Sequence, residues 1–123
     1  MGDGGLDSAR ELVEALLEYW DSHRAILSVR NLSAQEGDQR FRAVRNESLR
    51  PLLEGLAAKV EESQRVGRVA REVAPMAAAA ALAAMLERTA AFHSDLELLG
   101  VQRNELVETT ARIVYQTVTG IDA

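Results

Sequence analysis

The chain has 123 residues, of which 47% are hydrophobic and 27% charged, and 19 acidic residues outweigh 14 basic ones for a formal net charge of −5. A chain of this length is expected to form one domain that folds without disulfide or metal staples. The absence of cysteine excludes disulfide scaffolds, cysteine-ligated zinc sites and thiol nucleophiles. The acidic balance argues against this chain alone binding a nucleic-acid backbone.

The N-terminus carries neither the basic nor the apolar stretch of a secretory signal. Its glycines predict a flexible segment over residues 1–7, followed by one helical domain over residues 8–123. The longest apolar run, Met76 to Leu86, is shorter than the ~20 residues that a membrane span needs. We therefore expect a cytoplasmic protein with no membrane contact.

The first part of the chain predicts two helices separated by a bend. Ser8 to Glu11 form a capping-box pattern, and an apolar stripe at helical spacing follows from Leu12 to Trp20. Asp21 and Ser22 favour caps over helix interiors, so we expect a bend at these two residues. The second helix then ends before Gly37.

The third predicted helix is the longest. Asp38 is a suitable cap, and apolar residues recur at spacings of three and four from Phe41 to Val60. Pro51 lies inside this pattern and removes one backbone donor, which predicts a kink. Gly67 is placed to end the helix.

Two further helices complete the chain. Pro75 is typical of a first helical turn, and the fourth helix continues through His93. A loop at Leu98 to Gly100 precedes the last helix, which runs from Gln102 to Gly120. The prediction is an all-α bundle of five helices.

The last two predicted helices carry apolar or small residues on more than one face, whereas a surface helix of a monomer keeps a polar face. This pattern favours a homodimer in which both helices pack on their own bundle and on a twofold partner. The alternative is that alanine is present only as a good helix former. The predicted interface residues are Ala84, Arg88, Leu106, Val107, Thr110, Val114 and Val118.

The sequence shows no catalytic or metal-binding pattern. His23 and His93 are the only histidines, and His93 with Asp95 and Glu97 is the nearest approach to a metal cluster, at a predicted helix end where such residues usually act as caps. There is no strained serine elbow and no glycine-rich phosphate loop after a strand. The arginines of the third helix are interleaved with glutamates, as on a solvated face. We therefore expect no enzyme activity, metal or cofactor.

Large apolar residues on three of the predicted helices suggest a ligand pocket. Trp20 is the only tryptophan, and Gly55 leaves room beside the leucines of the third helix. A close-packed core would produce the same pattern, so both interpretations stay open. The candidate pocket residues are Trp20, Leu49, Leu52, Leu56, Met85, Leu86 and Phe92.

Four segments in order resemble the C-terminal domain of TetR-family transcriptional regulators. They are Leu16 to Ala25, the long third helix ending in Gly67, Ala81 to Thr89, and Leu106 to Gly120. The similarity spans residues 8 to 120. Within the family, the pattern is most similar to the actinobacterial subgroup that contains the repressor of ethionamide activation.

The resemblance implies a homodimeric ligand-sensing domain whose last two helices form a four-helix bundle with their symmetry mates. It also implies a cavity for a small, largely apolar effector, lined by Leu16, Trp20, Leu49, Leu52, Leu56, Leu86 and Val114. The subgroup carries polar amides where this chain has Ala83 and Leu86, so a ligand that needs hydrogen bonds there is not expected. The family's N-terminal helix-turn-helix is not among these residues, which implies that DNA is reached only through such a domain or a full-length partner. The rival interpretation is a stand-alone helical dimerisation or interaction protein with a filled core and no ligand.

Overall fold

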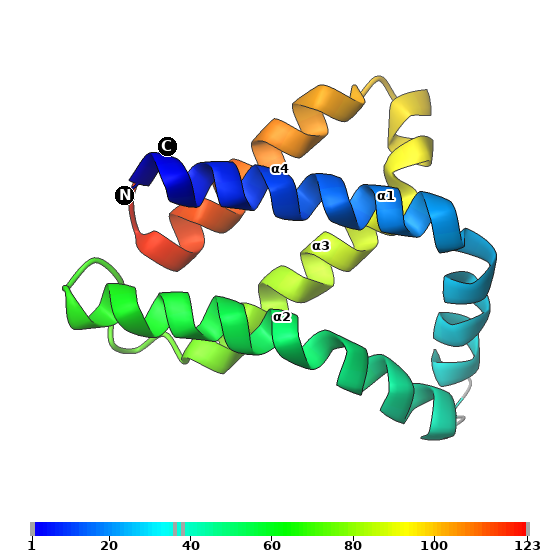
Figure 1. Ribbon diagram of the computed structural model, residues 1–123, viewed down its shortest axis with the longest axis horizontal. Coiled ribbons are helices and arrows are strands. Elements are labelled where there is room, and N and C mark those ends of the chain that lie inside the picture. Colours follow the sequence, from blue (N-terminus) through cyan, green and yellow to red (C-terminus); the bar gives the residue numbers. More distant parts are fainter. Residues whose placement is uncertain (1, 36, 38, 123) are drawn as a thin grey trace.

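The computed structural model describes residues 2–35, 37 and 39–122, which form four helices. These are α1 (Gly2–Gln35), α2 (Gln39–Arg65), α3 (Pro75–Leu98) and α4 (Arg103–Thr119) (Figure 1). The described residues contain no strand, so the predicted all-α class is confirmed. The described residues form four helices and not the five predicted, because the first two predicted helices are joined end to end as α1, across a kink.

α1 is kinked at His23, whose backbone angles (φ −125°, ψ 23°) are not helical. The bend predicted at Asp21 and Ser22 is therefore present, one residue further along at His23. The His23 ring stacks on Tyr19 with ring centroids 4.4 Å apart, and its Nδ1 lies 2.9 Å from the Tyr19 carbonyl oxygen. The side chain at the kink thus contacts the preceding turn.

The predicted start of the first helix at Ser8 is wrong, because α1 begins at Gly2. Leu6 packs against the core. Gly5 lies against the ring of Tyr115, where an added Cβ would be only 2.8 Å from Cε1. Contacts made far along the chain therefore extend the helix beyond the local capping signal.

The other helices end close to the glycines, and α3 begins at the proline, that the sequence analysis singled out. Gly67, Gly100 and Gly120 have positive φ just after α2, α3 and α4, and Pro75 begins α3. α2 continues through Pro51 and changes direction near its middle (Figure 1). A proline inside a helix removes one hydrogen bond and favours such a bend.

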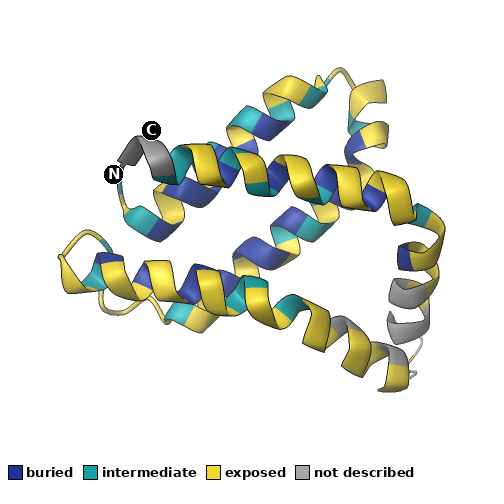
Figure 2. Cartoon of the chain, in the orientation of Figure 1, coloured by how far each residue is buried: buried dark blue, intermediate teal, exposed yellow. Residues whose placement is uncertain are grey.

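The core lies where the helices cross. α1 crosses in front of α3 and α4, and α2 runs below them in the view of Figure 1. Every pair of helices is in contact. The largest fully buried side chains come from three helices: Val13 and Leu17 on α1, Val60 on α2 and Leu86 on α3. Figure 2 shows buried positions mostly where helices face one another, while most of the outward surface is exposed.

The core stops short of the turn that joins α1 to α2. Between Leu27 and Leu49, every residue whose burial is described is exposed, including Val29 (58%) and Val44 (57%). The side chain of Phe41, which belongs to the predicted apolar stripe, lies outside the described residues. Among the described residues, the packed core therefore ends at Leu27 on α1 and at Leu49 on α2.

Candidate functional site

A cavity of about 230 Å³ lies between α1, α2 and α3, and we call it the Trp20 cavity. Trp20 and Leu27 line it from either side of the kink in α1, Leu49 and Leu52 from α2, and Leu86 from α3. Leu86 and Trp20 are almost fully buried, at 2% and 6% exposure, so the walls belong to the core of the bundle.

The tryptophan of this cavity is held by neighbouring groups. The guanidinium of Arg24 lies 6.0 Å from the centre of the Trp20 ring. The same guanidinium donates a hydrogen bond of 2.7 Å to the carbonyl oxygen of Ala91 on α3. Trp20 therefore lies beside the hydrogen bond from Arg24 that joins α1 to α3.

Few polar groups reach the Trp20 cavity. They are the side chains of Tyr19, Ser48 and Glu87 at its edge. A mostly apolar pocket with a small number of polar groups is typical of a site for a small organic ligand. Because the volume lies below the ~300–1,000 Å³ of drug-sized sites, this cavity suits a small molecule.

The structure brings together five of the nine predicted ligand-binding residues around this cavity: Leu16, Trp20, Leu49, Leu52 and Leu86. Leu56 and Val114 line a different cavity. Met85 packs against the core but lines neither cavity. Phe92 is 43% exposed, with the Arg88 guanidinium 4.6 Å from its ring centre, so it points away from both.

The second cavity, of about 300 Å³, lies between the first turns of α1, the last turns of α2 and the end of α4, and we call it the Tyr115 cavity. The sequence interpretation did not predict it as a separate site. The residues that would have indicated it are Tyr115, an aromatic one position after Val114, and Gly5, which leaves room for its ring.

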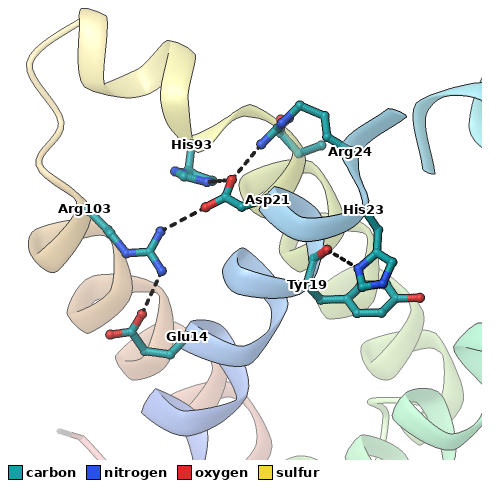
Figure 3. A network of polar contacts seen from close by, with 8 residues as sticks. Glu14, Tyr19, Asp21, His23, Arg24, His93 and Arg103 are labelled. Atoms are coloured by element: carbon teal, nitrogen blue, oxygen red, sulfur yellow. Dashed lines mark hydrogen bonds and ion pairs between the residues drawn. The ribbon is translucent and has the colours of Figure 1, made fainter. Parts of the chain in front are cut away.

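A polar network lies just before the kink and joins three helices (Figure 3). Asp21 accepts a hydrogen bond from Nε2 of His93 (2.7 Å) and another from Arg24 (3.0 Å), and its second oxygen lies 3.6 Å from Arg103. Burial raises the pKa of Asp21, but the hydrogen bonds from His93 and Arg24 outweigh it, so the pKa lies below its ordinary value. The ionised carboxylate of Asp21 therefore links α1 to His93 on α3 and to Arg103 on α4.

His93, the strongest candidate metal ligand of the sequence, takes part in this tie. It is 5% exposed, and no hydrogen-bond partner is found for its Nδ1 among the described residues. No group of three or more His, Asp or Glu side chains placed to hold a metal ion occurs in the described part of the chain.

The whole chain, residues 1–123, matches the family model of the tetracyclin repressor-like C-terminal domain. The chain belongs to this family of TetR-like domains. Comparisons with curated proteins and with solved structures gave no match. The resemblance seen in the sequence is therefore confirmed at the level of the domain family.

In this TetR-like domain, α3 and α4 each carry residues that the rest of the chain leaves exposed. Predicted interface residues Ala84 and Arg88 are exposed on α3, and Leu106 is half-buried on α4. The other four predicted interface residues are buried inside the single chain: Val107, Thr110, Val114 and Val118. The exposed side of α4 instead presents Thr109, Ile113 and Thr117, with Ile113 at 42% exposure.

The apolar run of α3 likewise contains both buried and exposed residues. Ala79, Leu82 and Leu86 are buried, whereas Ala77 and Ala81 are exposed. No helix in the described part of the TetR-like domain is long and apolar enough to cross a membrane.

Proposed function

We propose that this chain is the effector-binding and dimerisation domain of a TetR-like transcriptional regulator, and that the Trp20 cavity takes a small, largely apolar effector. The observation that carries the proposal is that Leu16, Trp20, Leu49, Leu52 and Leu86, from three helices, surround one apolar cavity. A core without space would favour the rival interpretation of a filled dimerisation protein.

The position of the cavity supports a mechanism for sensing. Trp20 and Leu27 lie on either side of the non-helical residue His23, so a ligand between them contacts both arms of α1. A ligand that prefers one kink angle shifts the population of α1 toward it. A DNA-binding domain linked to this one would then respond to the shift through the coupling of the two sites.

Dimerisation in this proposal uses the exposed faces of α3 and α4. We define the α3/α4 surface as Ala77, Ala81, Ala84, Arg88, Leu106, Thr109 and Ile113. Its one charged residue is Arg88, on α3. Its alanines let two helices approach closely, which favours packing against the same surface of a second copy.

Binding to the Trp20 cavity is tested with toluene and cyclohexane, using the emission of Trp20 as the readout. Trp20 is the only tryptophan of the chain, so its emission reports on this cavity directly. We expect either probe to change the emission saturably. Ala83→Leu and the milder Leu49→Phe fill the cavity, since both residues line it, and should abolish the change.

The matched control is Ala58→Leu, which places the same side chain on an exposed position of α2, outside both cavities and outside the α3/α4 surface. It should bind the probes as the natural chain does. No saturable change with the natural chain, or equal binding by both filled variants, would show that the Trp20 cavity is not an effector site.

A further inference from the structure

The Tyr115 cavity has features of a second binding site, and the argument for it is independent of the proposed function. Its apolar walls come from Leu12 on α1, Leu56 on α2 and Val118 on α4. Tyr115 closes one side, with its ring against the backbone of Gly5. The larger volume, about 300 Å³, reaches the size range of small-molecule sites.

The walls of this cavity are joined by one buried and one exposed hydrogen bond and by a close backbone contact. Ser63, 2% exposed, donates a hydrogen bond of 2.7 Å to the carbonyl oxygen of Val118, and Arg68 Nε donates one of 3.0 Å to that of Thr119. Gly120 approaches Arg68 so closely that an added Cβ would lie 2.2 Å from the Arg68 carbonyl oxygen. A cavity held open in this way requires little ordering when a ligand enters.

The rim of the cavity is positively charged, although the chain as a whole is acidic. Lys59, Glu62 and Arg68 line it, and the carboxylate of Glu62 is paired with Arg65. Among the described residues, no carboxylate lies within ion-pair distance of Lys59 or Arg68. Two cations without an acidic partner therefore stand beside an apolar interior.

We propose that the Tyr115 cavity binds a small amphipathic carboxylate, with a single apolar tail between Leu12, Leu56 and Val118 and its carboxylate at Lys59 and Arg68. Moving the tail out of water raises the binding affinity about fourfold for each methylene that is buried. The attraction between the carboxylate head and the two partly solvated cations adds to the affinity, and added salt weakens this attraction.

The test is calorimetric titration of the full chain with octanoate, with octanol and octylamine as probes of the same tail and a neutral or cationic head. Octanoate should bind most tightly and octylamine most weakly. Hexanoate, two methylenes shorter, should bind about fifteenfold more weakly than octanoate. Trp20 does not line this cavity, so its emission should stay unchanged while octanoate binds.

Lys59→Met keeps the aliphatic stem of an exposed residue and removes its charge. It should weaken octanoate binding about fivefold, as expected for loss of an exposed ion pair, and leave octanol binding unchanged. The matched control is Arg50→Met, which removes an exposed charge of α2 where neither Arg50 nor its partner Glu47 lines the cavity, and which should not weaken octanoate binding.

The proposal is overturned if octanol binds as tightly as octanoate, which would mark a plain apolar groove, or if Lys59→Met has no effect. It is also overturned if octanoate does not bind, or if its binding changes Trp20 emission and is lost in Ala83→Leu. If toluene does not bind in the Trp20 cavity, the octanoate experiment can still support a site in the Tyr115 cavity. The two proposals are therefore tested independently.

Discussion

At the scale of single residues, Glu108 is the carboxylate most strongly held in its charged form. Arg10 on α1 donates to it at 2.7 Å and 3.0 Å, and Arg112 donates at 2.7 Å from the next turn of α4. The hydrogen bonds from Arg10 and then Arg112 lower the pKa of Glu108 from 4.5 to about 2. Glu108 therefore ties the start of α1 to α4 in its ionised state.

This shift predicts how the stability depends on pH. Because the pKa of Glu108 is lower in the folded than in the unfolded chain, its contribution is complete above about pH 4.5 and is lost as the pH falls towards 2. On acidification through this window, the Tm of the natural chain should fall more than that of Glu108→Gln, as measured by circular dichroism. Parallel Tm curves for the two proteins would contradict this assignment.

Two glycines after helices allow a matched comparison of backbone effects. Gly120 and Gly100 both have positive φ, but an added Cβ meets the Arg68 carbonyl oxygen at Gly120 and nothing within 4 Å at Gly100. Gly100→Ala should cost about 1–2 kcal/mol of unfolding free energy from its backbone conformation alone. Gly120→Ala should cost at least twice as much in urea denaturation. Equal costs would show that the C-terminal segment moves away from Arg68 without strain.

At the scale of helices, Asp21 joins α1 to α3 and α4 next to the kink. Asp21→Ala removes the hydrogen-bond acceptor of His93, which is buried, and should cost about 1–3 kcal/mol of unfolding free energy. Asp95→Ala, at an exposed position of α3, is the control and should change stability by less than about 0.5 kcal/mol. The comparison is made by urea denaturation, and equal effects would refute a structural tie at Asp21.

Much of the helical pattern could be predicted from the sequence because apolar spacing and the glycine and proline positions act locally. The early start of α1 could not. The first residues are rich in glycine, which has weak helix propensity, but packing of Leu6 and contact of Gly5 with Tyr115 outweigh this local preference.

The candidate site shows a second limit of sequence reasoning. Leu52 and Leu56 lie one turn apart on the same side of α2, yet they line different cavities. Helical spacing identifies the face on which a residue lies but not its level along the bundle. α4 shows a different limit, because it has two apolar sides and its spacing does not indicate which of them the core covers. Val114 was therefore predicted for both a pocket and an interface.

At the scale of the whole molecule, the α3/α4 surface predicts that the chain works as a pair. Ile113→Glu places a charge in the middle of the exposed side of α4 and should convert a dimer to a monomer without loss of helix content. Val66→Glu is the control, because Val66 is a similarly exposed apolar residue (53%) just after α2 and outside that surface. This variant should stay dimeric.

The most direct test of this account is sedimentation equilibrium of the full chain at tens of micromolar, compared with Ile113→Glu. The account predicts a mass twice the 13.4 kDa of one chain for the natural protein and a single-chain mass for Ile113→Glu. A natural chain that sediments as a monomer, or an Ile113→Glu variant that remains a dimer, would contradict it.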